Sequence, residues 1–166
     1  MFVIVDIKSS NLTSIRNAFG RIGAEIEVAS SPESLLSAEA IILPGVGAFK
    51  HGMSALESGG YVDVLKKCVL ENKTPLMGIC LGMQLLADES EEHGVNKGLG
   101  LIKGRVVVLK PTEKEYRVPN IGWYETAGVK NGCLFPAGKG SDSFYFVHSY
   151  HFQCHDIKDV AATISY

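Results

Sequence analysis

The first half of the chain alternates short apolar runs with stretches of helical periodicity. Residues of helical spacing, such as Leu12, Ile15, Phe19 and Ile22 after the capping residue Asn11, predict amphipathic helices. This alternation of strand and helix predicts a parallel sheet with helices on both faces, an α/β fold. The predicted strands are Phe2–Val5, Glu25–Ala29, Ala40–Leu43 and Pro75–Ile79, and further helices are predicted from Pro32, over Tyr61–Glu71 and from Leu81 to about Glu89.

The pattern changes after Gly94, where strand-like runs follow one another with turns between them and no convincing helix. We therefore expect one domain over residues 1–166, in which hairpins extend a mostly parallel sheet. The expected strands of this half are Gly104–Lys110, Arg117–Trp123, Ser143–Gln153 and Val160–Ser165.

Composition narrows the class of protein. The 166 residues are 46% hydrophobic, which is enough for one hydrophobic core and argues against a disordered chain. The net charge of −2 argues against a basic surface that binds nucleic acid. Apolar runs are too short to cross a bilayer, and the start lacks a signal pattern, so we expect a cytoplasmic protein. The four cysteines have no C-x-x-C spacing and are expected to be free thiols. No cofactor signature is present.

One cysteine lies where chemistry is expected. In the run Gly78-Ile79-Cys80-Leu81-Gly82, a predicted strand passes directly into a predicted helix. This is the form of a nucleophile elbow with Cys in place of Ser, in which small residues let strand and helix approach closely. Free N–H groups at the start of the helix could hold an oxyanion. We favour a catalytic Cys80 over the alternative, a small buried thiol.

A second glycine-containing segment, Pro44-Gly45-Val46-Gly47, ends the preceding parallel strand. It is weak evidence for phosphate binding, because no helix with a third glycine is expected to follow. It could be an ordinary βα loop. Since strands in parallel end at one edge of the sheet, the loop could instead give the elbow a second backbone donor.

The histidine-rich segment His148–His155 suggests a metal site by composition alone. In a strand, however, His151 and His155 face one way and His148 the other, and two convergent ligands make a poor zinc site. We interpret these histidines as surface or hydrogen-bonded residues. The acidic residues from Asp88 to Glu92 are interpreted as a solvated helix end.

Four segments, in this order along the chain, together match a known family. They are Pro44 to Phe49, Gly78 to Gln84, Val118-Pro119-Asn120-Ile121-Gly122-Trp123 and Tyr145-Phe146-Val147-His148-Ser149-Tyr150. The chain resembles, over essentially its whole length, the glutaminase subunits of imidazole glycerol phosphate synthases, a branch of the class I glutamine amidotransferases. The resemblance implies a flavodoxin-like three-layer fold and hydrolysis of glutamine to glutamate and ammonia, with no cofactor.

The resemblance also implies roles for single residues. Cys80 would form a thioester with the substrate, and N–H groups of Val46, Gly47 and Leu81 would form the oxyanion hole. Ammonia would pass to a (β/α)8-barrel synthase subunit in a heterodimer, with Gly122 and Trp123 near the interface. The residues implied to bind glutamine are Gly45, Gly47, Gln84, His148, Ser149 and Tyr150.

The chain departs from the family pattern in ways that leave alternatives open. The family's catalytic His-Pro-Glu motif is absent from these residues, so we expect a form shortened by the C-terminal strands and helix that carry it. Without that motif, a catalytically incomplete subunit that only docks a synthase is an alternative. Asn120 stands where the family usually has His, and Tyr124 where it usually has Asn. The run from His93 to Ile102 fits a related branch that supplies ammonia for amino sugars of bacterial surface polysaccharides.

Overall fold

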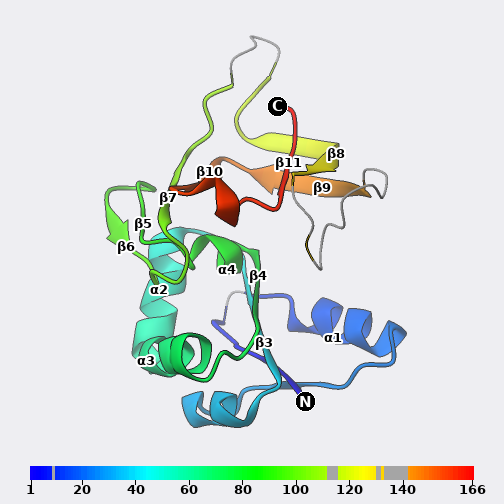
Figure 1. Cartoon of the computed structure of the whole chain (residues 1–166), viewed down its shortest axis with the longest axis vertical. Helices are drawn as coiled ribbons and strands as arrows, with labels where there is room; N and C mark the ends of the chain where they lie inside the picture. The colour runs from blue at the N-terminus through cyan, green and yellow to red at the C-terminus, as the bar shows by residue number, and fades with distance from the viewer. Residues whose placement is uncertain (9, 112–115, 130–131, 133–141) are drawn as a thin grey trace.

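The parallel sheet expected from the first half is present. The computed structural model describes residues 1–8, 10–111, 116–129, 132 and 142–166. Four parallel strands lie in the order β2-β1-β3-β4 (Figure 1). Their bounds are Phe2–Ile4 for β1, Ile26–Val28 for β2, Ala40–Gly45 for β3 and Leu76–Cys80 for β4.

Each face of this sheet is covered by apolar side chains from different helices. Ile4 and Ile42 pack on one face with Leu12, Ile15 and Phe19 of helix α1 (Leu12–Arg21). On the other face, the larger cluster joins strand residues such as Val3 and Leu43 to helices α2 (Phe49–Ser58) and α3 (Tyr61–Lys66). Helices on both faces complete the three-layer arrangement expected for the α/β class.

Helix α1 is close to its prediction. Asn11 caps it, with Oδ1 accepting a hydrogen bond from the N–H of Ser14 at 3.1 Å, and Gly23 follows at a φ of 72°. The prediction that Ile22 lies on the buried face is wrong, because this residue lies beyond the last helical turn and is 76% exposed.

Other helical predictions need correction. Helix α2 was not predicted, although Phe49, Met53 and Leu56 have helical spacing and are all buried. The helix expected to reach Glu89 is the single turn α4 (Leu81–Gln84). Pro32–Ser37 is a 3-10 helix, and α3 continues as the π-helical turn Lys67–Glu71.

The second half forms two further sheets rather than hairpins added to the parallel one. One has the order β10-β7-β5-β6 and packs near α4, and the other has the order β11-β8-β9. The predicted strand Ser143–Gln153 is two strands that belong to different sheets and separate at Ser149. The bounds are Glu89–Ser90 (β5), Asn96–Lys97 (β6), Gly104–Val108 (β7), Asn120–Gly128 (β8), Asp142–His148 (β9), Tyr150–Cys154 (β10) and Ala162–Thr163 (β11), with a 3-10 turn at Ile157–Asp159.

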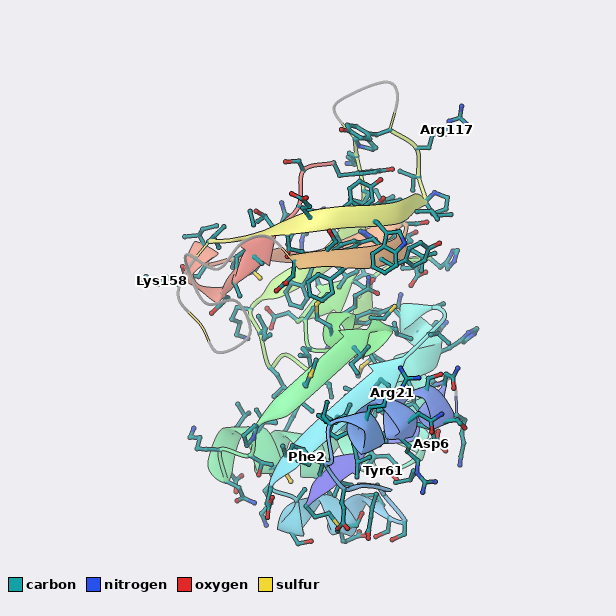
Figure 2. All side chains as sticks on the ribbon, turned by 90° about the vertical axis from the view of Figure 1, so that its right-hand side faces the viewer. Phe2, Asp6, Arg21, Tyr61, Arg117 and Lys158 are labelled. Carbon is teal, nitrogen blue, oxygen red and sulfur yellow. The ribbon has the colours of Figure 1, made fainter. Side chains whose placement is uncertain are left out.

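The β8–β9 pair, here called the ribbon, lies beyond the carboxyl ends of β3 and β4 (Figure 1). Its cross-strand register pairs Asn120 with His148 and Trp123 with Tyr145. Ring side chains stand on both of its faces (Figure 2). Among the helices within the described residues, none has the length and apolar character needed to span a membrane.

Candidate active site

Cys80 lies at the sharp turn that the sequence predicted. It is the last residue of β4 and directly precedes α4, with backbone angles φ 54° and ψ −117°. A positive φ is unfavourable for a residue with a side chain, and such strain is concentrated at functional sites. The thiol is free and exposed. The local backbone therefore holds the sulfur outward at the end of the sheet, as in a nucleophile elbow.

The glycines on either side of Cys80 are required by close backbone contacts. A methyl group on Gly82 would lie 1.7 Å from the carbonyl oxygen of Leu43 in β3. One on Gly78 would lie 2.4 Å from the Cα of Met83. Both distances are far shorter than any real contact, so only glycine allows β3, β4 and α4 to meet here.

The glycine loop lies beside the elbow. Gly45 is paired with Cys80 across β3 and β4, and a methyl group on it would lie 3.3 Å from the backbone nitrogen of Gly82. Gly47 has a φ of 101°, and the side chain of Val46 between them is 57% exposed. The pairing of loop and elbow predicted from sequence is confirmed in position.

An acidic residue next to this loop was missed by the sequence analysis. The N–H of Phe49, at the start of α2, donates a 2.7 Å hydrogen bond to Oε2 of Glu92. Glu91 and Asp88 likewise accept backbone hydrogen bonds, from Val108 and Gly104. The interpretation of this acidic segment as a solvated helix end is therefore wrong, since its carboxylates tie β5, β7 and α2 together. No local sequence pattern signals these long-range bonds.

Three of the expected glutamine-binding residues converge on one atom. Gln84, the last residue of α4, donates from Nε2 to the carbonyl oxygen of Tyr150 at 3.1 Å. Nδ1 of His148 lies 2.9 Å from the same oxygen. Ser149 lies between these two residues and accepts a hydrogen bond from Leu109 at 2.9 Å. The junction of β9 and β10 is thus attached to the helix that follows Cys80.

His148 is held by hydrogen bonds rather than grouped with other histidines as a metal ligand. Nε2 of His148 is 3.1 Å from Nδ2 of Asn120, so both of its ring nitrogens have partners. Burial, followed by the proximity of His148, lowers the pKa of His151, which favours its neutral ring. Within the described residues, there is no group of three or more side chains able to hold a metal ion.

The other cysteines differ from Cys80 in their surroundings. Cys68 is buried, its Sγ lies 3.4 Å from the carbonyl oxygen of Leu35, and burial raises its pKa. Cys154 is a half-buried thiol in β10 that is not in a disulfide, and Cys133 lies outside the described residues. The expectation of free thiols is confirmed for the three cysteines that the structure describes.

An α/β fold with an exposed cysteine on a strained elbow between a parallel strand and a helix defines a class of cysteine nucleophile enzymes. The family model for glutamine amidotransferase class-I matches residues 3–165. The chain therefore belongs to the class I glutamine amidotransferase family.

Individual relatives agree with this assignment. "Imidazole glycerol phosphate synthase subunit HisH 1" of Campylobacter jejuni is 40% identical over 156 residues, which are 94% of this chain and 77% of the relative. "Imidazole glycerol phosphate synthase subunit HisH 2" of Methanococcus maripaludis is 42% identical over 167 residues, covering 100% of this chain and 81% of the relative. A solved structure described as a glutamine amidotransferase has a TM-score of 0.74 at 22% identity, covering 96% of this chain and 78% of its own. That likeness supports the fold.

Proposed function

We propose that this chain is the glutaminase subunit of an imidazole glycerol phosphate synthase, which hydrolyses glutamine and delivers ammonia for histidine biosynthesis. The observation that carries the proposal is the exposed Cys80 on its strained elbow. Relatives at 40% and 42% identity that are subunits of this synthase support it. These names favour histidine biosynthesis over the amino-sugar pathway.

The reaction begins at the sulfur of Cys80. Its thiolate attacks the side-chain amide carbon of glutamine. In the resulting tetrahedral intermediate, the nitrogen receives the proton that the base took from the thiol and leaves as ammonia, which leaves a thioester. Water then attacks the thioester carbon, which releases glutamate and restores the thiol. The ammonia passes to the synthase subunit.

The loop beside the elbow is suited to stabilise the intermediate. The negative oxygen would be held by backbone N–H groups of Leu81 and of Val46 or Gly47, on either side of the sulfur. The pairing of Gly45 with Cys80 keeps both donors near the reacting carbon. Gln84 and the segment His148–Tyr150 would line the pocket for the glutamine substrate.

A base must remove the proton of the Cys80 thiol. His148 is not proposed for this role, because its two ring nitrogens are bonded to Asn120 and to the carbonyl oxygen of Tyr150. The resemblance assigns the role to a His-Pro-Glu motif, which residues 1–166 do not contain.

The outer face of the ribbon is proposed to dock the synthase subunit, a (β/α)8 barrel. Ile121, Trp123, Tyr145 and Val147 point to this face and are 56%, 72%, 55% and 57% exposed. Exposed aromatic and branched residues in one group are typical of protein interfaces. The heterodimer is proposed to work in the cytoplasm.

The test is release of ammonia from glutamine by the purified chain mixed with a cyclase subunit of imidazole glycerol phosphate synthase. When the base of the His-Pro-Glu motif is supplied together with residues 1–166, we expect turnover that is lost in Cys80→Ala and retained in Cys154→Ser, which removes another accessible sulfur. Retained turnover in Cys80→Ala would overturn the choice of nucleophile. A chain that binds the cyclase but releases no ammonia would instead be the catalytically incomplete docking subunit.

A further inference from the structure

A continuous chain of hydrogen bonds joins the ribbon to the helix that follows Cys80. Nδ2 of Asn120 in β8 is 3.1 Å from Nε2 of His148 in β9. Nδ1 of His148 is 2.9 Å from the carbonyl oxygen of Tyr150, which also accepts the 3.1 Å bond from Gln84 in α4. Four residues from four elements are thus linked through one carbonyl oxygen.

The chemistry of these atoms fixes the direction of each bond. A carbonyl oxygen only accepts, so Nδ1 of His148 must carry a hydrogen. In the neutral ring, Nε2 is then an acceptor, and the Asn120 amide must donate to it. Asn120 thereby selects the form of His148 that can hold the Tyr150 carbonyl.

The carbonyl of Tyr150 is turned away from the neighbouring strand β7. The carbonyl of Ser149 accepts from the N–H of Leu109, and in an antiparallel ladder the next residue directs its own groups to the opposite side. Gln84 and His148 occupy that side. A carbonyl oxygen has two lone pairs, and these two donors fill both.

Asn120 is placed in an unfavourable environment for a polar side chain. It is fully buried, and within the described part of the chain its Oδ1 has no hydrogen-bond partner. An unpaired buried amide oxygen destabilises a protein, so the position calls for a compensating role. Among the described residues, the side chain of Asn120 has one hydrogen-bond partner, His148. Its neighbour Ile121 points to the exposed outer face of the ribbon.

We propose that Asn120 and His148 are positioning residues that hold the Tyr150 carbonyl and, through it, the Gln84 amide in the geometry that binds glutamine. The glutamine-binding part of this inference rests on the proposed function.

The test compares Asn120→Leu with Thr126→Val in the chain with its cyclase subunit. Leucine branches at Cγ as asparagine does but cannot donate to His148. Thr126 is a matched control: it is also buried on β8, and its Oγ1 donates a 2.8 Å bond to Asp142 at the other end of the ribbon. We expect the glutamine KM to rise roughly fivefold in Asn120→Leu, the range for one lost hydrogen bond, with a smaller change in kcat. Thr126→Val should leave the glutamine KM unchanged.

Variants of His148 distinguish the effect of its hydrogen bonds from the effect of its size. His148→Gln keeps one donor and one acceptor, whereas His148→Phe keeps a ring without either. The glutamine KM should rise more in His148→Phe than in His148→Gln. Equal effects of these two variants, or equal effects of Asn120→Leu and Thr126→Val, would overturn the proposal.

A second measurement does not depend on glutamine at all. In heteronuclear NMR spectra of the chain, the side-chain amide signal of Gln84 should shift in Asn120→Leu and stay in place in Thr126→Val. If the wild-type protein neither binds nor hydrolyses glutamine, the proposed function fails, while this shift still decides whether the chain of bonds exists. An unmoved Gln84 signal in Asn120→Leu would overturn the inference.

Discussion

Replacing Gly82 by alanine tests the close approach of strand and helix at the elbow. The added methyl group would lie 1.7 Å from the carbonyl oxygen of Leu43, whereas a normal carbon–oxygen contact is about 3.3 Å. Helix α4 and strand β3 would have to separate by about 1.5 Å, within a core where Leu43 and Leu81 are buried. Overpacking of this kind costs about 3 kcal/mol or more, because backbone rather than a mobile side chain must move.

The free energies of unfolding of Gly82→Ala and Gly20→Ala, measured in urea, are compared with that of the wild-type protein. Gly20 lies in the exposed helix α1 with nothing within 4 Å of an added methyl group, so its substitution should stabilise the protein by about 0.5–1 kcal/mol. The midpoint temperature of thermal unfolding should fall by about 6–12 °C in Gly82→Ala and rise slightly in Gly20→Ala. A Gly82→Ala protein as stable as wild type would refute the elbow geometry.

Three further predictions address the partner surface, the acidic segment and the cap of α2. Trp123→Ala should weaken binding of the synthase subunit at least about tenfold by titration calorimetry but change stability by only about 0.5 kcal/mol; unchanged affinity would remove this face as the docking site. Hydrogen bonds from Lys103 and then from the N–H of Gly104 lower the pKa of Asp88, so its stabilisation is present above its unfolded pKa and is lost as the pH falls through the folded value. The stability difference between wild type and Asp88→Asn should therefore shrink on acidification, and a difference that does not change between neutral and acid pH would contradict this. Glu92→Gln should destabilise the protein by about 1 kcal/mol in urea at neutral pH, because the charged acceptor of the Phe49 N–H is lost; an unchanged midpoint would contradict the cap.

The elbow could be predicted from sequence because its requirements are local. A glycine two residues before and two residues after Cys80, at the junction of a predicted strand and helix, already specifies a tight turn. The contacts of Gly78 with Met83 and of Gly82 with Leu43 are the physical reason for that pattern. The neighbouring loop was predictable for a related reason, since adjacent parallel strands must end at the same edge.

The length of α4 could not be predicted, because distant backbone groups decide it. The carbonyl oxygens of Leu85, Leu86 and Ala87 accept hydrogen bonds from Leu99, Leu101 and Gly100 rather than from a continuing helix. Helix α2 was missed because its local helical signal is weak. Gly52 weakens its local helical signal, and it also allows a close approach to α4, since a methyl group there would lie 3.0 Å from the side chain of Leu85.

The break between β9 and β10 also lies outside local sequence information. Ser143–Gln153 reads as one strand, but the chain changes sheets at Ser149, where β8 and β7 offer different partners. That change brings His148 and Tyr150 to Gln84, so the predicted binding residues meet through tertiary pairing.

Cys80 is tested most directly as the nucleophile by finding which residue a diazoketone analogue of glutamine alkylates. The adduct is located by mass spectrometry of the peptides from the chain mixed with its synthase subunit. We expect one adduct, on Cys80, which added glutamine prevents and which Cys80→Ala abolishes. Buried Cys68 serves as an internal control and should stay unmodified. Alkylation of another cysteine with Cys80 unmodified would contradict the choice of Cys80 as the nucleophile. Labelling that glutamine does not slow would contradict a glutamine site at this cysteine.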